Sequence, residues 1–176
     1  MSRQAQGDRR QRPIDAPALE ALALAYAARY ATTRAKLAAY LSRKLTVRQW
    51  VGTGSPPVED IVARMAEAGY VDDRAFAEAR GRSLARRGYG RRRVAAALAA
   101  DGIAAEDRQG ALPDDEEGAR AAALAFARRR RIGPYAAEPA TGDVRARAIA
   151  AMIRAGHEPE LARAIISAPP GDNDAD

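Results

Sequence analysis

One eight-residue pattern occurs three times in this chain of 176 residues. It reads RAKLAAYL at 34–41, RRRVAAAL at 91–98 and RARAIAAM at 145–152. Its last residue is Leu41, Leu98 or Met152, so the pattern recurs after 57 and then 54 residues. A fixed period of this length is typical of repeat proteins in which each unit packs on its neighbours. The pattern therefore predicts three rounds of a unit that contains about three helices.

Apolar residues at three- and four-residue steps predict the helices of each round. They are expected near 17–30, 33–45 and 58–68, then 73–87 and 91–101, then 119–131, 144–155 and 159–168, with a shortened helix within 104–113. No segment shows the sustained alternation of a strand. The predicted fold is all-α, an elongated, curved array of tandem three-helix repeats.

This pattern divides the chain into five predicted segments. They are a disordered basic arm at 1–16, repeat 1 at 17–70 with a loop insertion at 46–57, repeat 2 at 71–113, repeat 3 at 114–168, and an acidic disordered tail at 169–176. Thr32 or Thr33 is expected to cap one helix, and Asp72 or Asp73 another. Trp50, the only tryptophan, is either an exposed contact or a plug between two repeats, and the plug is favoured.

The residues that most enzyme sites need are scarce. The chain has no cysteine, and its one histidine, His157, lies in a Gly-His-Glu-Pro turn where we expect it near solvent. Gly52-Thr53-Gly54 lacks the rest of a phosphate-binding loop. Aromatic residues make up only 5% of an alanine-rich chain, which argues against a deep pocket. We therefore expect no catalytic residue, no cofactor and no metal.

The segment 80–93 accounts for the chain's net positive charge. It contains seven arginines and no acid, while the formal net charge of the whole chain is +6. Without these arginines the net charge would be −1, so the basicity is local. A concentrated field of one sign indicates a partner of the other sign: nucleic acid, an acidic protein or a membrane surface. The alternative is a solvated helical pair, partly balanced by Glu78.

A second run of arginines, 128–131, ends a predicted helix, where cations also suit the helix dipole. Tyr89, between two glycines, either stacks on a base or anchors the turn. The candidate partner-binding residues are Arg80, Arg82, Arg86, Arg87, Tyr89, Arg91, Arg92, Arg93, Arg128, Arg129, Arg130 and Arg131.

The segment 69–103 also resembles a known family. Asp-Asp precedes a Phe-Ala-Glu-Ala helix start, and Arg-Ser, Arg-Arg-Gly-Tyr-Gly, Arg-Arg and a closing Asp-Gly-Ile follow in order. The order and spacing of these residues resemble the central repeat of RecX proteins, the bacterial modulators of the RecA recombinase. The positions that carry this resemblance are Tyr70, Asp72, Asp73, Phe76, Ala77, Arg82, Ser83, Gly88, Tyr89, Gly90, Arg92 and Gly102.

The resemblance implies a protein of tandem three-helix repeats that lies along the groove of the RecA filament on single-stranded DNA. There it would inhibit ATP hydrolysis, strand exchange and RecA-promoted repressor cleavage without chemistry of its own. Of the matched positions, Arg82 and Arg92 are the implied contacts and the glycines are structural. The insertion at 46–57 and the sparse third repeat depart from the family pattern.

The expected partners are the RecA nucleoprotein filament and single-stranded DNA, with double-stranded DNA as a further candidate. We expect a monomer in the cytoplasm, since no apolar run reaches the roughly 18 residues that span a bilayer. Two alternatives stay open: a stand-alone basic helical DNA-binding protein, and a scaffold that docks an acidic protein.

Overall fold

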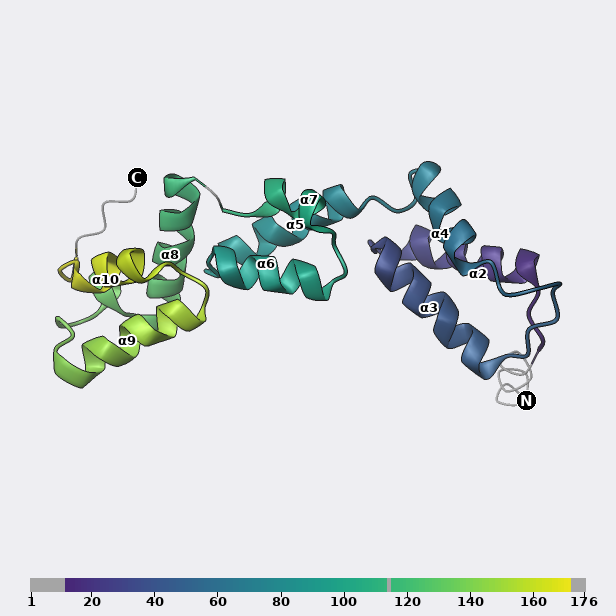
Figure 1. Ribbon diagram of the computed structural model, residues 1–176. Coiled ribbons are helices and arrows are strands. Elements are labelled where there is room, and N and C mark those ends of the chain that lie inside the picture. The colour runs from purple at the N-terminus through teal and green to yellow at the C-terminus, as the bar shows by residue number, and fades with distance from the viewer. Residues whose placement is uncertain (1–11, 114, 172–176) are drawn as a thin grey trace. The chain divides into compact units, whose positions relative to one another are not determined.

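The structure is a computed structural model that describes residues 12–113 and 115–171 (Figure 1). In these ranges the secondary structure is helical, and one isolated β-bridge joins Ile14 to Trp50. The predicted all-α fold is therefore confirmed. The elements are α2 (Ala16–Arg29), α3 (Arg34–Val47), α4 (Val58–Glu67), α5 (Asp73–Arg86), α6 (Arg91–Ala100), α7 (Ala105–Arg108), η1 (Gln109–Ala111), α8 (Glu116–Arg130), η2 (Gly133–Tyr135), α9 (Gly142–Arg154) and α10 (Pro159–Ser167).

The repeated octapeptide occupies the second helix of each round, α3, α6 and α9. Its fourth and eighth residues lie four positions apart, on one face of a helix. In all three helices both positions are buried. The residues are Leu37 and Leu41, Val94 and Leu98, and Ala148 and Met152. The sequence period thus reflects one recurring core-facing stripe.

The chain forms two compact units. Unit 1 runs through Phe76 and includes Asp101–Ile103, whereas unit 2 comprises Ala77–Ala100 and the residues from Ala104 onward. Helix α5 therefore begins in unit 1 and ends in unit 2. The three repeat boundaries drawn from the sequence stay predictions, since the units divide the chain at different residues.

Unit 1 begins earlier than the sequence indicated. Ile14 is fully buried, and its backbone exchanges hydrogen bonds with Gln49 (2.9 Å) and Val51 (3.1 Å). Asp15 then caps α2 by accepting from the Ala18 amide at 2.9 Å. The disordered arm was predicted to reach residue 16, which is wrong for residues 14–16, because apolar burial and a cap fix them. Residues 1–11 and the end of the tail, 172–176, lie outside the described residues.

Trp50 packs against the core of unit 1, not between repeats. Its indole Nε1 donates to the Gly54 carbonyl at 2.8 Å, which closes the predicted loop on itself. The favoured prediction, that Trp50 lies between two repeats, is therefore wrong. Residues 48–57 contain no helix, whereas 46 and 47, expected in the loop, belong to α3. The core that Trp50 adjoins consists of Ile14, Leu19, Ala23, Leu37, Leu41, Ile61, Val62, Met65 and Val71.

Thr33, rather than Thr32, caps α3. Its hydroxyl oxygen accepts from the Lys36 amide at 3.1 Å, and the same hydroxyl donates to the Asp101 carbonyl at 2.9 Å. The Lys36 ammonium lies 2.7 Å from a carboxylate oxygen of Asp101 and 4.6 Å from the centre of the Phe76 ring. Asp101 is thereby held against the start of α3 inside unit 1.

The two acids before α5 have different roles. Asp72 accepts from the Ala75 amide at 2.8 Å and so caps α5. Asp73 accepts from the Arg34 amide at 2.9 Å, at the start of α3. One acid therefore starts its own helix, and the other ties that helix to a neighbour 39 residues earlier.

The core of unit 2 lies among α8, α9 and α10. The shortened helix expected within 104–113 is confirmed as α7 and η1. In α10 the buried alanine is Ala162, whereas Ala164 is exposed. The buried cluster consists of Ala123, Phe126, Ala127, Ala148, Met152, Ala155, Ala162, Ile165 and Ile166.

Candidate functional site: an arginine-lined groove in unit 2

The Gly88-Tyr89-Gly90 turn brings the end of α5 against α8. Gly88 has φ +80°, a backbone conformation that is unfavourable for residues with a Cβ. A Cβ at Gly88 would also lie 2.5 Å from the amide nitrogen of Phe126. Only glycine therefore permits this turn and this close approach together.

The same turn places the start of α6 against the end of α9. The amides of Gly90 and Arg92 donate to the carbonyls of Ala155 and Gly156, just after α9, at 3.0 and 3.2 Å. The Arg92 guanidinium donates to the carbonyls of Ile153 (3.2 Å) and His157 (3.3 Å). Arg92 thus places its cation at the C-terminal end of α9, where a positive charge suits the helix dipole. Arg92, predicted as a contact, thus has a structural task.

His157 is buried, with 3% of its surface exposed, at the junction of these segments. Its Nε2 lies 3.0 Å from the Gly88 carbonyl oxygen, and its ring meets the edge of Phe126 at 5.7 Å between centroids. The expectation that His157 lies near solvent is wrong, since its side chain packs against Gly88 and Phe126. Burial lowers the pKa of His157, and the hydrogen bond to Gly88 opposes part of that shift.

The lowered pKa of His157 predicts that unit 2 loses stability in acid. The unfolded chain takes up a proton near the ordinary pKa of about 6.5, whereas the folded chain resists protonation to lower pH. Stability should be constant above that pH and fall below it, by at most about 1.4 kcal/mol per pH unit. Urea unfolding at pH 7.5 and 5.5 measures the loss. His157→Gln should be less stable at pH 7.5 but should lose less on acidification; an equal loss in both proteins would contradict the prediction.

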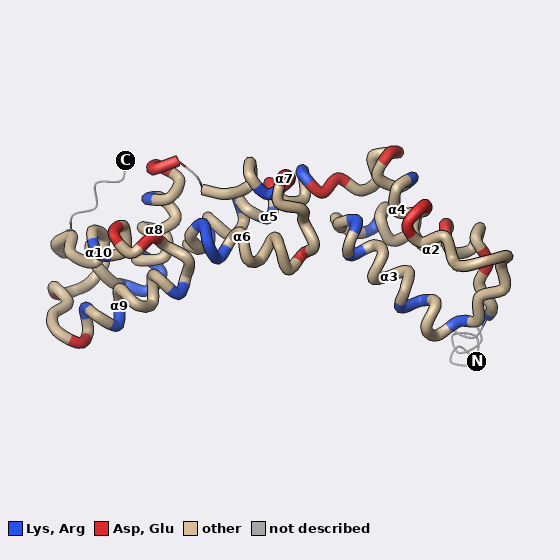
Figure 2. The backbone as a smooth tube through the Cα atoms, viewed as in Figure 1, with Lys and Arg blue, Asp and Glu red and all other residues tan. Residues whose placement is uncertain are grey.

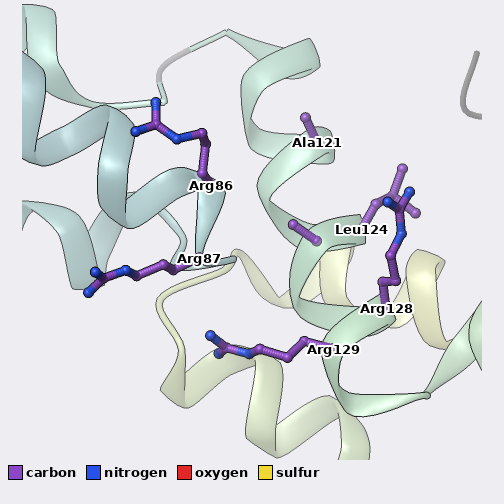
Figure 3. A pocket seen from close by; sticks show the side chains of 7 residues that line it. Arg86, Arg87, Ala121, Leu124, Arg128 and Arg129 are labelled. Carbon is purple, nitrogen blue, oxygen red and sulfur yellow. The ribbon is translucent and has the colours of Figure 1, made fainter.

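A groove runs between the end of α5 and the outer face of α8. One part, of about 490 Å³, is lined by Arg86, Arg87, Ala121, Leu124, Ala125, Arg128 and Arg129. An adjoining part, of about 620 Å³, shares Arg86, Ala121 and Ala125 and adds Arg82, Ala85, Pro113, Gly118 and Ala122. Figure 3 shows Ala121, Leu124, Arg128 and Arg129 on α8 and, across from them, Arg86 and Arg87 with their guanidinium groups turned away from α8. The groove therefore has an apolar floor and cationic walls.

The arginines of the groove are exposed and weakly neutralised. Arg82 lies 3.7 Å from Glu78, one turn earlier on α5. In the part of the chain that the structure describes, no carboxylate is within ion-pair distance of Arg86 or Arg87. Arg129 lies over the Tyr89 ring at 5.7 Å, which orients its guanidinium. Such a groove can take up phosphates or carboxylates together with a small apolar group.

The remaining predicted contacts lie outside this groove. Arg80 is half-buried, whereas Arg91 and Arg93 are exposed in the first turn of α6, which Figure 2 shows as basic. Arg130 lies over the Phe126 ring at 5.7 Å. Arg131 has φ 54° and ends α8. The structure thus unites Arg82, Arg86, Arg87, Arg128 and Arg129 and leaves the others apart.

Tyr89 is half-buried and packs against the core of unit 2, so its ring anchors the turn. The floor alanines of the groove were missed as site residues. Alanine on an exposed face looks the same in sequence as alanine in a core, so Ala121, Ala122 and Ala125 do not stand out in the sequence. The signal that could have found them is their spacing on the same helix as Arg128 and Arg129.

No helix in the described ranges is both long and apolar enough to cross a membrane.

Comparison with known proteins agrees with this architecture. The family description "RecX, second three-helix domain" matches residues 72–112, which is the predicted second repeat within one residue at each end. The regulatory protein RecX of Myxococcus xanthus (strain DK1622) is 31% identical over 172 residues, covering 93% of this chain and 92% of that protein. The regulatory protein RecX of Mycobacterium sp. (strain JLS) is 40% identical over 109 residues, covering 61% of this chain and 57% of that protein. The repeats, the Gly-Tyr-Gly junction and this near full-length similarity together show that the chain belongs to the RecX family of regulatory proteins.

Proposed function

We propose that this chain binds the RecA filament on single-stranded DNA and inhibits its ATPase, strand-exchange and coprotease activities. It would act in the cytoplasm as a monomer, without catalysis of its own, in recombination, DNA repair and the SOS response. Membership of a regulatory family supports the proposal, and the RecA partner follows from the family resemblance.

The observation that carries the proposal is the arginine-lined groove between α5 and α8. It gathers five exposed arginines, Arg82, Arg86, Arg87, Arg128 and Arg129, around a floor of small residues. Like charges so close repel one another, and an anionic partner removes that cost. A small apolar side chain beside an acidic group on RecA, or a phosphate of the bound strand, would fit this lining.

The direct test is RecA ATP hydrolysis on single-stranded DNA, titrated with this chain. Dose-dependent inhibition is expected. Inhibition at amounts far below those of RecA would indicate that filament ends are capped, whereas inhibition near equal amounts would indicate that the filament groove is occupied. Full ATPase activity at saturating amounts of a folded chain would overturn the proposal.

The exposed arginines also favour a second candidate, a stand-alone DNA-binding protein. Arg91 and Arg93 lie at the N-terminal end of α6, where the helix dipole disfavours cations, so their positions are better explained by contact with phosphates than by helix stability. This candidate predicts tight binding to bare DNA. The logarithm of the binding constant should fall with the logarithm of the salt concentration, with a slope of roughly 0.7 to 0.9 per phosphate contacted. Weak DNA binding at physiological salt, with filament affinity retained, would exclude it.

A further inference from the structure

Unit 1 carries a patch of three tyrosines, of which Tyr26 and Tyr40 also pack against its core. The rings of Tyr26 (α2) and Tyr40 (α3) stack with 4.1 Å between centroids and 18° between planes. Tyr30, which ends α2, adds a third ring 5.2 Å from Tyr26 and remains 49% exposed. A hollow of about 460 Å³ opens beside these rings, lined by Ala25, Tyr26, Arg29, Tyr30 and Tyr40.

Cations surround this patch. The Arg29 guanidinium lies 5.4 Å from the centre of the Tyr30 ring, and the Lys44 ammonium lies 5.1 Å from that of Tyr40. Burial raises the pKa of the Tyr40 hydroxyl, while the positive charges of Arg48 and Arg43 act in the opposite direction. The tyrosine–cation patch therefore comprises Tyr26, Tyr30, Tyr40, Arg29, Arg43 and Lys44.

The exposed ring of Tyr30, with cations beside it, matches one class of ligand better than others. Single-stranded nucleic acid offers unpaired bases that stack on aromatic rings and phosphates that meet arginine and lysine. A duplex keeps its base faces stacked inside, and a purely apolar protein surface would leave the cations unpaired.

We propose that the tyrosine–cation patch binds single-stranded nucleic acid. One base stacks on Tyr30 and enters the hollow beside Tyr26, and the adjacent phosphates contact Arg29 and Lys44. The patch lies in unit 1 and shares no residue with the groove of unit 2. The proposal does not rest on RecA binding.

The test is fluorescence anisotropy of a labelled oligothymidylate with the full chain, in the absence of RecA. Tyr30→Ala should weaken binding about 5- to 100-fold, the loss expected when one stacked base loses its aromatic partner. Tyr30→Phe, which retains the stacking face, should bind within about twofold of the unaltered chain. The backbone bond from the Tyr30 amide to the Tyr26 carbonyl does not involve the side chain, so α2 keeps its end.

Tyr70→Ala is the matched control, because Tyr70 is 50% exposed in the same unit but lies outside the patch. It should leave binding unchanged. A loss as large as that of Tyr30→Ala, or no loss in Tyr30→Ala, would overturn the proposal.

An oligonucleotide of equal length without bases separates stacking from phosphate contact. The unaltered chain should bind it more weakly than oligothymidylate, and Tyr30→Ala should abolish most of that difference. Equal affinity of the unaltered chain for both strands would show that phosphates alone are bound and would overturn the proposal. Since RecA is absent, none of these results depends on whether the chain inhibits RecA.

Discussion

Replacing Arg82, Arg86 and Arg87 together with alanine is expected to raise the half-inhibitory concentration against RecA ATP hydrolysis by at least about tenfold. Each charge-assisted hydrogen bond to an anionic partner contributes roughly 1.5–3 kcal/mol, so losing even one accounts for a change of this size. All three side chains are exposed on one wall of the groove. The measurement is a titration of RecA ATPase on single-stranded DNA with each protein.

The fold should tolerate this triple substitution. Alanine favours helix at least as well as arginine, and the ion pair that is removed, Arg82 with Glu78 one turn away, contributes roughly 0.5 kcal/mol or less. Circular dichroism and urea unfolding should therefore match those of the unaltered chain.

A matched control removes the same charge from another face of unit 2. Arg147, Arg154 and Arg163 are exposed on α9 and α10 and do not line the groove. Their joint replacement by alanine should leave inhibition within about twofold, apart from weak long-range electrostatics. Equal losses in both triple variants would show that net charge, not the groove, is recognised. If the folded variant lacking Arg82, Arg86 and Arg87 still inhibits as well as the unaltered chain, the groove is not the partner-binding site.

Gly88→Ala is expected to destabilise unit 2 by about 3 kcal/mol. The added Cβ meets the Phe126 backbone, and the positive φ of residue 88 adds strain, so overpacking and strain act together. The turn also holds the carbonyl that His157 contacts, so its displacement would disturb the packing of α8 against the end of α9. Urea unfolding followed by circular dichroism gives the change in the free energy of unfolding.

Gly69→Ala separates the two causes of that loss. Gly69 has φ +76°, close to that of Gly88, but an added Cβ there meets nothing within 4 Å. Its replacement should cost about 1 kcal/mol, from backbone strain alone. If Gly88→Ala lowers the free energy of unfolding no more than Gly69→Ala does, the Phe126 backbone does not lie close to residue 88 in solution.

Much of the secondary structure and of the core could be read from the sequence. Helix formation depends on residues three and four apart and on caps within one turn, so the octapeptides, the acid pair before α5 and the glycine turns carry that information locally. The same locality made the Arg-rich segment evident. The family resemblance, carried by the residues of 69–103, is confirmed by the comparisons.

Tertiary contacts decided which of these residues form a site. Arg86 and Arg128 are 42 positions apart, and only the packing of Gly88 on Phe126 brings their helices to one groove. The local pattern suggested that Arg92 and His157 both face solvent. In the structure Arg92 donates a hydrogen bond to the His157 carbonyl after α9, and the His157 side chain is buried. Tyr26, Tyr30 and Tyr40 come together in the same way, through the pairing of α2 with α3. A side chain's partner across helices depends on long-range packing, which local periodicity does not encode. Sequence therefore determined the helices and their inward faces, and the tertiary structure decided which outward side chains share a surface.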